Sequence, residues 1–474
     1  MDNIGKYKIS TIKNIKAKDV HLYRQILASA YRGVVESSAR NDQQGLVLAC
    51  RFLFLFPPIL LSKPDTAVPQ RLDAFLAGDL RLCTRGLLTV HDNYINKGDR
   101  APHITKHRQA AARVFDGQYA KAVQVLTRTD SSTTYEERKE AMDSKHPKRT
   151  TEDDTHIKSL PPSLPSPPLD ERTIYDTLRK STRRGIAPGP NGDRFEYLQS
   201  VIFDPYKNPE AAATLHLLTK FANLEKGGSL PSEWYEYNTF STLVALGDKM
   251  RPLGMGTTGR KLVTAATMSK AAKEIQSEFA PFQLGSMVRN GCEAVVHLIR
   301  KMHDTFGDTH VIISIDVANA FNTVSRLQGL ISIAQSIPSL YTYAYRTYSL
   351  KNKLWMDGPD EQTRVPISSE EGSTQGAVDG GVFFNTALNH ALKEVNAVLQ
   401  GEHTGAFVAI ADDVVGCVTP HMARQALDII TKRFGTLNLS INYNKCVILA
   451  DSQILLDQLD FRDNPSFSRI KTKV

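Results

Sequence analysis

The sequence predicts an α+β protein with a mainly helical first part and a layered β-α-β-β-α-β unit in its last third. In the first part, apolar residues recur at three- and four-residue spacing, which is typical of amphipathic helices. In the last third, short apolar runs alternate with longer helical patterns, in the order of the split βαβ, or ferredoxin-like, plan. The expected elements are a strand at Val311–Ile315, a helix at Ala377–Leu399, strands at Ala406–Ala411 and Val414–Val418, a helix at Pro420–Leu437 and a strand at Ile441–Leu449, with further helices between the first strand and the first of these helices.

The helical pattern of the first part is clearest in Leu22–Val35 and Ala110–Leu126. After Thr127 the composition changes to Ser, Thr, Lys, Asp and Glu, and the stretch ends in SLPPSLPSPPL. Such a segment is too poor in apolar residues to pack, so we expect an extended, polyproline-like linker. The predicted organisation is a basic helical extension at 1–127, a polar and proline-rich linker at 128–169, and three further parts at 170–300, 301–450 and 451–474.

Four elements are expected between the linker and the last third. Asp170 can cap a short amphipathic helix that extends to Arg184 and ends at GIAPGPNG. The others are a helix at Ala211–Leu224 that stops at Gly227-Gly228, a strand at Phe240–Leu246 and a helix at Gly259–Phe279.

Composition excludes several classes of protein. Of the 474 residues, 41% are hydrophobic and 23% are charged, so a folded core is possible and a wholly disordered chain is excluded. The five cysteines are widely scattered and form no C-x-x-C pair. This pattern argues against a disulfide framework and against a zinc finger, and it suits a reducing compartment.

The net charge of +8 is concentrated in the first third of the chain. Residues 1–150 hold 25 Lys and Arg against 15 Asp and Glu, a net +10, whereas residues 151–474 hold 33 against 35, a net −2. A basic region of this kind can bind a polyanion, because each neutralised phosphate releases counterions. A solvated basic surface is the alternative that composition leaves open.

Neither a secretory signal nor a membrane span is expected. Residues Met1–Lys18 contain five lysines and no apolar run. The most apolar stretch, Val47–Leu61, is shorter than the roughly 20 residues of a membrane helix and contains Pro57-Pro58. We expect a buried helix end followed by a turn there. The protein is expected to be intracellular, in the nucleus or cytoplasm, with no membrane partner.

Two positions in the predicted sheet carry carboxylates. Asp316 follows the strand Val311–Ile315, and Asp412 and Asp413 form the turn in AFVAIADDVVGCV, where this pair is the only charge. The strand order would bring the three carboxylates to one edge. Two-metal nucleotidyl transfer uses such groups to hold divalent cations about 3.5–4 Å apart, and Mg²⁺ prefers oxygen ligands. The alternative is ordinary turn chemistry, because Asp is common in hairpin turns.

The chain from about Asp170 to Ala450 resembles the reverse transcriptases of non-long-terminal-repeat retrotransposons. The resemblance is specific because seven motifs occur in the order of that family. They are GIAPGPNGDRFEYL (Gly185–Leu198), LVALGDKMRPLGMGTTGRKLV (Leu243–Val263), QLGSMVRNGCEAVVH (Gln283–His297), SIDVANAFNTVSR (Ser314–Arg326), GSTQGAVDGGVFFN (Gly372–Asn385), IADDV (Ile410–Val414) and LNLSINYNKC (Leu437–Cys446).

The resemblance implies a right-hand polymerase. Its fingers would be residues 170–300, its palm, with the ferredoxin-like plan, residues 301–450, and a remnant of its thumb or a tail residues 451–474. The implied activity is that of an RNA-directed DNA polymerase, which joins a dNTP to a primer 3′-hydroxyl with two Mg²⁺ ions, or Mn²⁺. The implied partners are an RNA template, a DNA primer and dNTP.

The resemblance also implies roles for residues of the acidic cluster. Asp316 and Asp412 would be metal ligands, and Asp413 would complete the cluster. Lys445 matches the lysine that is thought to protonate the pyrophosphate leaving group as a general acid. A plain surface lysine is the alternative for Lys445.

Five further residues match positions that bind the nucleotide. Arg251 matches the arginine of the fingers that contacts the triphosphate, and Lys249 would assist it. Phe321 matches the steric gate that excludes a ribose 2′-hydroxyl, with a core aromatic as its alternative. Gln375 and Gly376 match the motif that lies against the nucleotide and template.

Three departures from the family pattern bear on activity. Gln375-Gly376 is followed by Ala-Val-Asp-Gly-Gly where the family has D-P-L-G-P, and Ile410 replaces an aromatic residue. Only 29 residues follow Lys445, so we expect the thumb to be largely missing. The alternative function is therefore an inactive retroelement remnant that binds RNA. An RNA-templated RNA polymerase is disfavoured by Phe321.

Overall fold

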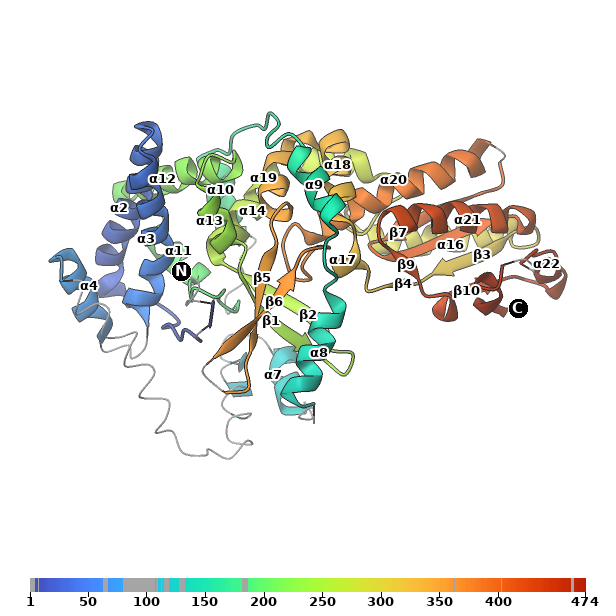
Figure 1. The fold of residues 1–474 in the computed structure, drawn as a ribbon, viewed down its shortest axis with the longest axis horizontal. Coiled ribbons are helices and arrows are strands. Elements are labelled where there is room, and N and C mark those ends of the chain that lie inside the picture. The colour runs from blue at the N-terminus through green and yellow to red at the C-terminus, as the bar shows by residue number, and fades with distance from the viewer. Residues whose placement is uncertain are drawn as a thin grey trace. The chain divides into compact units, whose positions relative to one another are not determined.

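Figure 1 shows the fold in a computed structural model. Within the described residues, the chain forms two compact units. The first comprises residues 1–143, 168–266 and 352–367, and the second comprises residues 144–167, 267–351 and 368–474. The structure describes residues 5–6, 8–62, 67–79, 107, 110–111, 113–114, 119–127, 133–180, 186–360, 363–401, 403–461 and 464–474.

Two predictions fall partly outside these residues. The helix expected at Ala110–Leu126 is described mainly through α7 (Tyr119–Thr127). The helix expected to extend to Arg184 is described as α10 (Glu171–Lys180), and Gly185 of the first quoted motif also lies outside the described residues.

The helices of the first unit pack through a cluster of aromatic rings. The Tyr23 ring of α2 lies 5.5 Å from the Phe56 ring of α3. The Phe221 ring of α12 lies 5.2 Å from Tyr31 of α2 and 5.3 Å from Trp234 of α13. Tilted and edge-on ring pairs at these distances are favourable beyond the area that they bury. The helices are α2 (Val20–Ala39), α3 (Gln43–Leu61), α12 (Pro209–Lys226) and α13 (Ser232–Asn238).

The most apolar stretch forms most of one continuous helix, α3, which corrects the prediction of a helix end followed by a turn. Pro57 and Pro58 lie inside the helix, where each removes one backbone donor. Both prolines are buried, and so are Phe54 and Phe56 beside them, so packing offsets the lost hydrogen bonds. Among the described helices, α3 alone is long and apolar enough to cross a membrane, and half of its apolar window is already buried within this structure.

A four-stranded sheet completes the first unit, in the order β2-β1-β5-β6. β1 pairs antiparallel with β2 and parallel with β5. Only β1 was predicted, because β2 contains a proline and two glycines, which weaken the strand pattern. The strands are β1 (Ser241–Leu246), β2 (Arg251–Gly256), β5 (Asn352–Asp357) and β6 (Arg364–Ser369), of which β6 extends into the second unit by two residues.

The second unit contains the predicted β-α-β-β-α-β order. Its sheet has the order β11-β10-β3-β8-β7, in which only β11 is parallel to its neighbour. Helices α20 and α21 contact each other, and their apolar side chains share one core with the sheet. The elements are β3 (Val311–Ile315), α20 (Gly380–Gly401), β7 (Gly405–Ile410), β8 (Asp413–Val418), α21 (Pro420–Thr436), β10 (Val447–Leu449) and β11 (Lys471–Lys473).

Two predicted elements are divided. The helix expected at Gly259–Phe279 is interrupted at Ala271, and the strand expected at Ile441–Leu449 is broken by a 3-10 turn at Tyr443–Lys445. The remaining elements are η1 (Ala17–Asp19), α4 (Val68–Leu76), α11 (Phe195–Val201), α14 (Thr258–Lys270), α15 (Ala272–Phe279), α16 (Gly291–Phe306), β4 (Val317–Ala318), α17 (Ala320–Thr323), α18 (Arg326–Ser336), α19 (Pro338–Tyr348), β9 (Ser440–Ile441), α22 (Gln453–Asp457) and η4 (Phe467–Arg469).

The segment expected to be an extended linker is partly helical and packed, which corrects that prediction. Ile157 is fully buried in the core of the second unit. The proline-rich residues that follow bind α19, where the Leu164 N–H donates to Thr342 Oγ1 at 2.9 Å and the Tyr341 hydroxyl donates to the Pro161 carbonyl at 2.7 Å. Polar contacts thus replace the missing apolar residues. The helices are α8 (Tyr135–Lys145) and α9 (Thr151–Ser159).

Candidate active site

The ends of β3 and β8 meet at one edge of the sheet in the second unit. Ile315 pairs with Val414 in antiparallel register, so the next residues in this register, Asp316 and Asp413, occupy opposite positions. Asp412 lies next to Asp413, in the turn between β7 and β8. The backbone therefore brings all three carboxylate residues to the same sheet edge.

The turn that carries Asp412 is held by a distant segment of the same unit. Ala411 has a φ of +54°, which is uncommon for a residue other than glycine. The buried Gln283 amide binds this backbone twice, donating to the Ala411 carbonyl at 3.2 Å and accepting from the Ala411 N–H at 3.0 Å. A Cβ at Gly285 would lie 2.1 Å from the Ala411 nitrogen. The close approach therefore requires glycine at this position.

The backbone of Asp316 is held on both sides by the segment after β9. Asn442 N–H donates to the Asp316 carbonyl at 2.8 Å, and the Cys446 Sγ accepts from the Asp316 N–H at 3.4 Å. Burial raises the pKa of the Cys446 thiol, which donates to the Asn442 carbonyl at 3.4 Å. Lys445 Nζ lies 3.6 Å from Asp316 Oδ2, and the Asp316 side chain is 36% exposed. The sheet edge thus combines carboxylates with one nearby ammonium.

Phe321 is linked to the loop that carries Gln375 and Gly376. Its ring stacks on Phe384 of α20, with ring centroids 4.7 Å apart, so it also belongs to the core. Its carbonyl accepts a hydrogen bond from the Ser373 N–H at 2.6 Å. Because Ser373 lies two residues before Gln375, the backbone of Phe321 and the start of this loop are fixed together.

The two predicted triphosphate-binding residues lie in the first unit. Arg251 begins β2 and pairs with Leu246 of β1, and Lys249 lies in the turn between the two strands. Both basic residues are exposed. They therefore belong to a different unit from the carboxylate residues.

The donor atoms at the sheet edge suit a divalent cation such as Mg²⁺, which prefers carboxylate oxygens and keeps several waters. The Lys445 ammonium beside Asp316 shows that this edge accommodates positive charge. In the part of the chain that the structure describes, however, no three His, Cys, Asp or Glu side chains form a group arranged to hold a metal ion. The carboxylate oxygens are therefore of the type that binds Mg²⁺, but among the described residues they do not form a complete set of metal ligands.

Sequence reasoning missed the residues that support the acidic ones. Gln283 and Cys446 lie within the quoted motifs, and Asn442 lies three residues before Lys445. A signal for these residues was present in the sequence, because each has a polar or thiol side chain in a motif next to an apolar strand. Buried polar groups usually have hydrogen-bond partners, so such side chains could have been expected to bind nearby backbone.

Part of the chain is similar to known proteins. Residues 246–460 match the family described as reverse transcriptase (RNA-dependent DNA polymerase). The retrotransposable element SLACS 132 kDa protein of Trypanosoma brucei gambiense is 24% identical over 298 residues, which are 60% of this chain and 24% of that protein. The match therefore spans about a quarter of the length of this relative.

Solved telomerase structures from Candida tropicalis are also similar, at low scores. A complex with the TWJ fragment of telomeric RNA has a TM-score of 0.36 and 9% identity, and covers 74% of this chain and 70% of that chain. An apo telomerase truncated from its C-terminal domain has a TM-score of 0.34 and 10% identity, with 74% and 87% covered. By sequence, residues 246–460 are similar to reverse transcriptases, or RNA-dependent DNA polymerases, and the chain has distant similarity to a retrotransposable element protein.

Proposed function

We propose that the chain is the RNA-directed DNA polymerase of a retroelement and extends a DNA primer on an RNA template. The register of β3 and β8 carries this proposal, because it brings Asp316 to the same sheet edge as Asp412 and Asp413 within a reverse transcriptase domain. In this proposal the β-α-β-β-α-β layer is the palm, and residues 170–300 supply the fingers.

In the reaction, the primer 3′-hydroxyl oxygen attacks the α-phosphorus of a dNTP, its proton leaves to solvent, and the bond to pyrophosphate breaks. Asp316, Asp412 and Asp413 would hold two Mg²⁺ ions, and bound ions would lower the pKa of the hydroxyl and offset charge on the phosphate. Lys445 would give a proton to the leaving pyrophosphate as a general acid. Its ammonium, 3.6 Å from the Asp316 carboxylate, is close enough to the acidic residues for this role.

Five further residues would bind the nucleotide. Arg251 and Lys249 would bind the triphosphate, because a guanidinium contacts phosphate oxygens bidentately. Phe321 would exclude the 2′-hydroxyl and so select deoxynucleotides. Gln375 and Gly376 would lie against the nucleotide and template. The hydrogen bond that links Phe321 to the start of the Gln375 loop supports a joint role for them.

One observation favours the second candidate, an inactive remnant that binds RNA. Asp379 lies in the loop that departs from the family pattern, directly before α20. Within the described part of the chain, both of its carboxylate oxygens are buried and have no hydrogen-bond partner. A buried carboxylate of this kind is costly. Because this departure lies in the loop that carries Gln375 and Gly376, it favours loss of nucleotide addition.

Primer extension distinguishes the two candidates. The full chain should add dNTPs to a DNA primer on an RNA template with Mg²⁺ or Mn²⁺. The Asp412→Asn/Asp413→Asn double variant should lose extension but keep its affinity for RNA. Asp428→Asn, an exposed carboxylate on α21 that pairs with Arg424, is the matched control and should extend normally. Salt-dependent RNA binding without extension by the unmodified chain would reject the polymerase and support the remnant.

A further inference from the structure

Arg149 is buried in the second unit, although it lies outside the region 246–460 that matches the reverse transcriptase family. Its side chain is 0% exposed. The guanidinium donates to the carbonyls of Tyr348 at 2.9 Å and Ser349 at 2.8 Å, and it donates to the Glu370 carbonyl through two nitrogens at 2.8 and 3.0 Å. One side chain from the segment before the family domain therefore joins two separate stretches of that domain.

The side chain of Glu370 is held by two lysines, one of which lies next to Arg149 in the sequence. Lys148, next to Arg149, lies 3.3 Å from one carboxylate oxygen, and Lys351 lies 3.0 Å from the other. Burial opposes ionisation, but hydrogen bonds from Lys351, Ser368 and Lys148 lower the pKa of Glu370 to about 2. Glu370 is therefore ionised at neutral pH and is fixed through both its backbone and its side chain.

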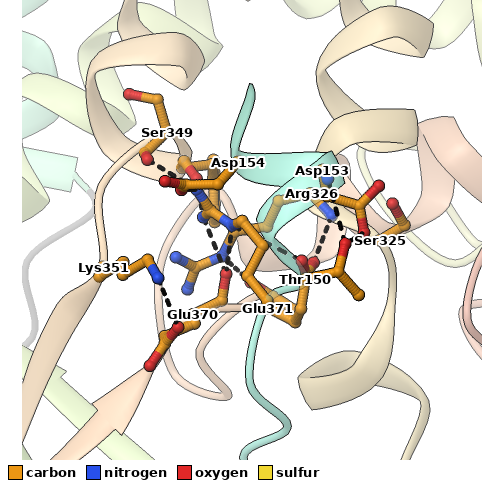
Figure 2. A network of polar contacts seen from close by, with 12 residues as sticks. Thr150, Asp153, Asp154, Ser325, Arg326, Ser349, Lys351, Glu370 and Glu371 are labelled. Atoms are coloured by element: carbon orange, nitrogen blue, oxygen red, sulfur yellow. Dashed lines mark hydrogen bonds and ion pairs between the residues drawn. The ribbon is translucent and has the colours of Figure 1, made fainter. Parts of the chain in front are cut away.

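Glu371 contacts both Arg149 and a second buried arginine, Arg326. Glu371 Oε1 lies 3.5 Å from Arg149 Nε, and its Oε2 accepts from the Arg326 N–H at 2.8 Å. The Arg326 guanidinium donates to the Gly372 carbonyl at 2.8 Å and to Ser369 Oγ at 2.9 Å. Figure 2 shows Glu371 and Arg326 in this network of polar contacts, with a dashed line that joins Lys351 to Glu370. The two arginines together thus contact every residue from 369 to 372.

Residues 369–372 directly precede the loop that carries Gln375 and Gly376. Gly372 has a φ of +69°, and a Cβ there would lie 2.2 Å from the Asn322 backbone, so the two segments are in close contact. The Gly372 N–H donates to the Val324 carbonyl at 2.9 Å, and the Ser373 N–H donates to the Phe321 carbonyl at 2.6 Å. Any shift of residues 369–372 would therefore move the backbone of Phe321.

The upstream segment also contacts the motif that contains Asp316. The side-chain amide of Asn319 donates to the Lys145 carbonyl at 2.9 Å, and Asn319 Oδ1 accepts from the Asn322 amide at 3.1 Å. Asn319 lies three residues after Asp316, in a left-handed conformation with a φ of +50°. Residues 145–149 thus bind both stretches that flank the proposed nucleotide site.

We propose that Arg149 is a positioning residue for nucleotide selection, which acts through Glu370, Glu371 and Arg326 on Phe321 and the Gln375 loop. The inference rests on the proposed polymerase function. Lysine should not replace Arg149, because only the planar guanidinium offers five donors in a fixed fork. Residues 145–149, which precede the matched region 246–460, then contribute to nucleotide selection and are not only a spacer.

The test compares full-length Arg149→Lys and Glu371→Gln with Lys139→Gln, which changes an exposed side chain on α8 that pairs with Asp143. In primer extension, Arg149→Lys should raise the KM for dNTP roughly tenfold with a smaller change in kcat, and it should lower discrimination against ribonucleotides. Glu371→Gln should shift both quantities in the same direction. Lys139→Gln should match the unmodified chain.

Amide hydrogen exchange provides a readout that does not need activity. Amides in residues 370–376 should exchange roughly tenfold faster in Arg149→Lys, and exchange elsewhere in the second unit should change less. The inference is overturned if Arg149→Lys lowers the melting temperature but leaves the dNTP KM, the discrimination and the exchange of 370–376 unchanged. If the unmodified chain extends no primer, the proposed function fails. The exchange of 370–376 then still decides whether Arg149 positions this loop.

Discussion

Gln283 binds Ala411 through both backbone groups, accepting from its N–H at 3.0 Å and donating to its carbonyl at 3.2 Å. Ala411 has a φ of +54° and directly precedes Asp412. A left-handed residue other than glycine costs about 1–3 kcal/mol and persists only where its surroundings fix it. The Gln283 amide supplies that support, so the direction of the Asp412 turn depends on a side chain from a distant segment.

Replacing Gln283 with methionine tests this dependence. Gln283→Met keeps the volume but leaves the N–H and carbonyl of Ala411 without their partner, at a cost of about 1–3 kcal/mol. We expect a melting temperature several degrees lower and a fall in kcat for nucleotide addition of roughly tenfold or more. Gln276→Met, which removes an exposed amide that binds the Met287 carbonyl, is the control. Equal losses in the two variants would contradict the role of Gln283.

Gly285→Ala should damage the same turn by a steric route. The new Cβ would lie 2.1 Å from the Ala411 nitrogen, and neither backbone can move without breaking the Gln283 contacts. We expect lower thermal stability and loss of primer extension. Gly435→Ala is the control, because a Cβ there meets no atom within 4 Å and alanine stabilises a helix by about 0.5–1 kcal/mol. Normal extension by Gly285→Ala would show that the close approach is unimportant.

Phe321→Val separates a steric gate from a core aromatic. If Phe321 excludes the 2′-hydroxyl, the smaller side chain should raise incorporation of ribonucleotides relative to deoxynucleotides by about tenfold or more. Loss of the stack on Phe384 should also lower stability. Phe434→Leu removes a buried ring from the same core and should lower stability without changing the ratio. A ratio that is equally unchanged in both variants would leave Phe321 as a core residue only.

Asp193 should make the stability of the first unit depend on pH. Burial raises the pKa of this carboxyl to about 7, although the Arg194 N–H donates to it at 2.9 Å. The folded chain then keeps a proton that the unfolded chain releases near pH ~4. This group's contribution therefore falls as pH rises from about 4 to 7, by at most about 1.4 kcal/mol per pH unit.

The check is the melting temperature of Asp193→Asn between pH 4 and 8. The variant should lose the part of the pH dependence that Asp193 causes, and it should be the more stable protein above pH 7. Asp176→Asn, an exposed carboxylate in the same unit that pairs with Lys180, should keep the pH dependence. The same slope in Asp193→Asn and the unmodified chain would contradict a raised pKa for Asp193.

The sheet of the second unit could be predicted because its main strands are short apolar runs with clear turns. β3 and β7-β8 follow this pattern, and the acidic residues lie where these strands end. The sequence did not predict β2, β5 and β6, because these strands are not short apolar runs bounded by clear turns. Pro252 within β2 is an example. α8 and α9 were missed because their amphipathic pattern is weak. Packing of a few residues such as Ile157, together with polar contacts, decides their structure.

The supports of the candidate site could not be predicted, because they arise from contacts between distant segments. Gln283 binds a residue 128 positions away, and Arg149 binds one 221 positions away. Spacing within one motif carries no information about such pairs. The carboxylate residues, in contrast, are brought together by a strand order that local patterns already indicate.

Asp316 and Asp412 are expected to share divalent cations during nucleotide addition, and counting bound Mn²⁺ by electron paramagnetic resonance tests this directly. The sample would contain the full chain, an RNA template, a primer that lacks its 3′-hydroxyl, and the matching dNTP. The unmodified chain should bind about two Mn²⁺ per complex, and Asp316→Asn and Asp412→Asn should each bind fewer. Equal Mn²⁺ counts in all three proteins would contradict a shared metal site at this sheet edge.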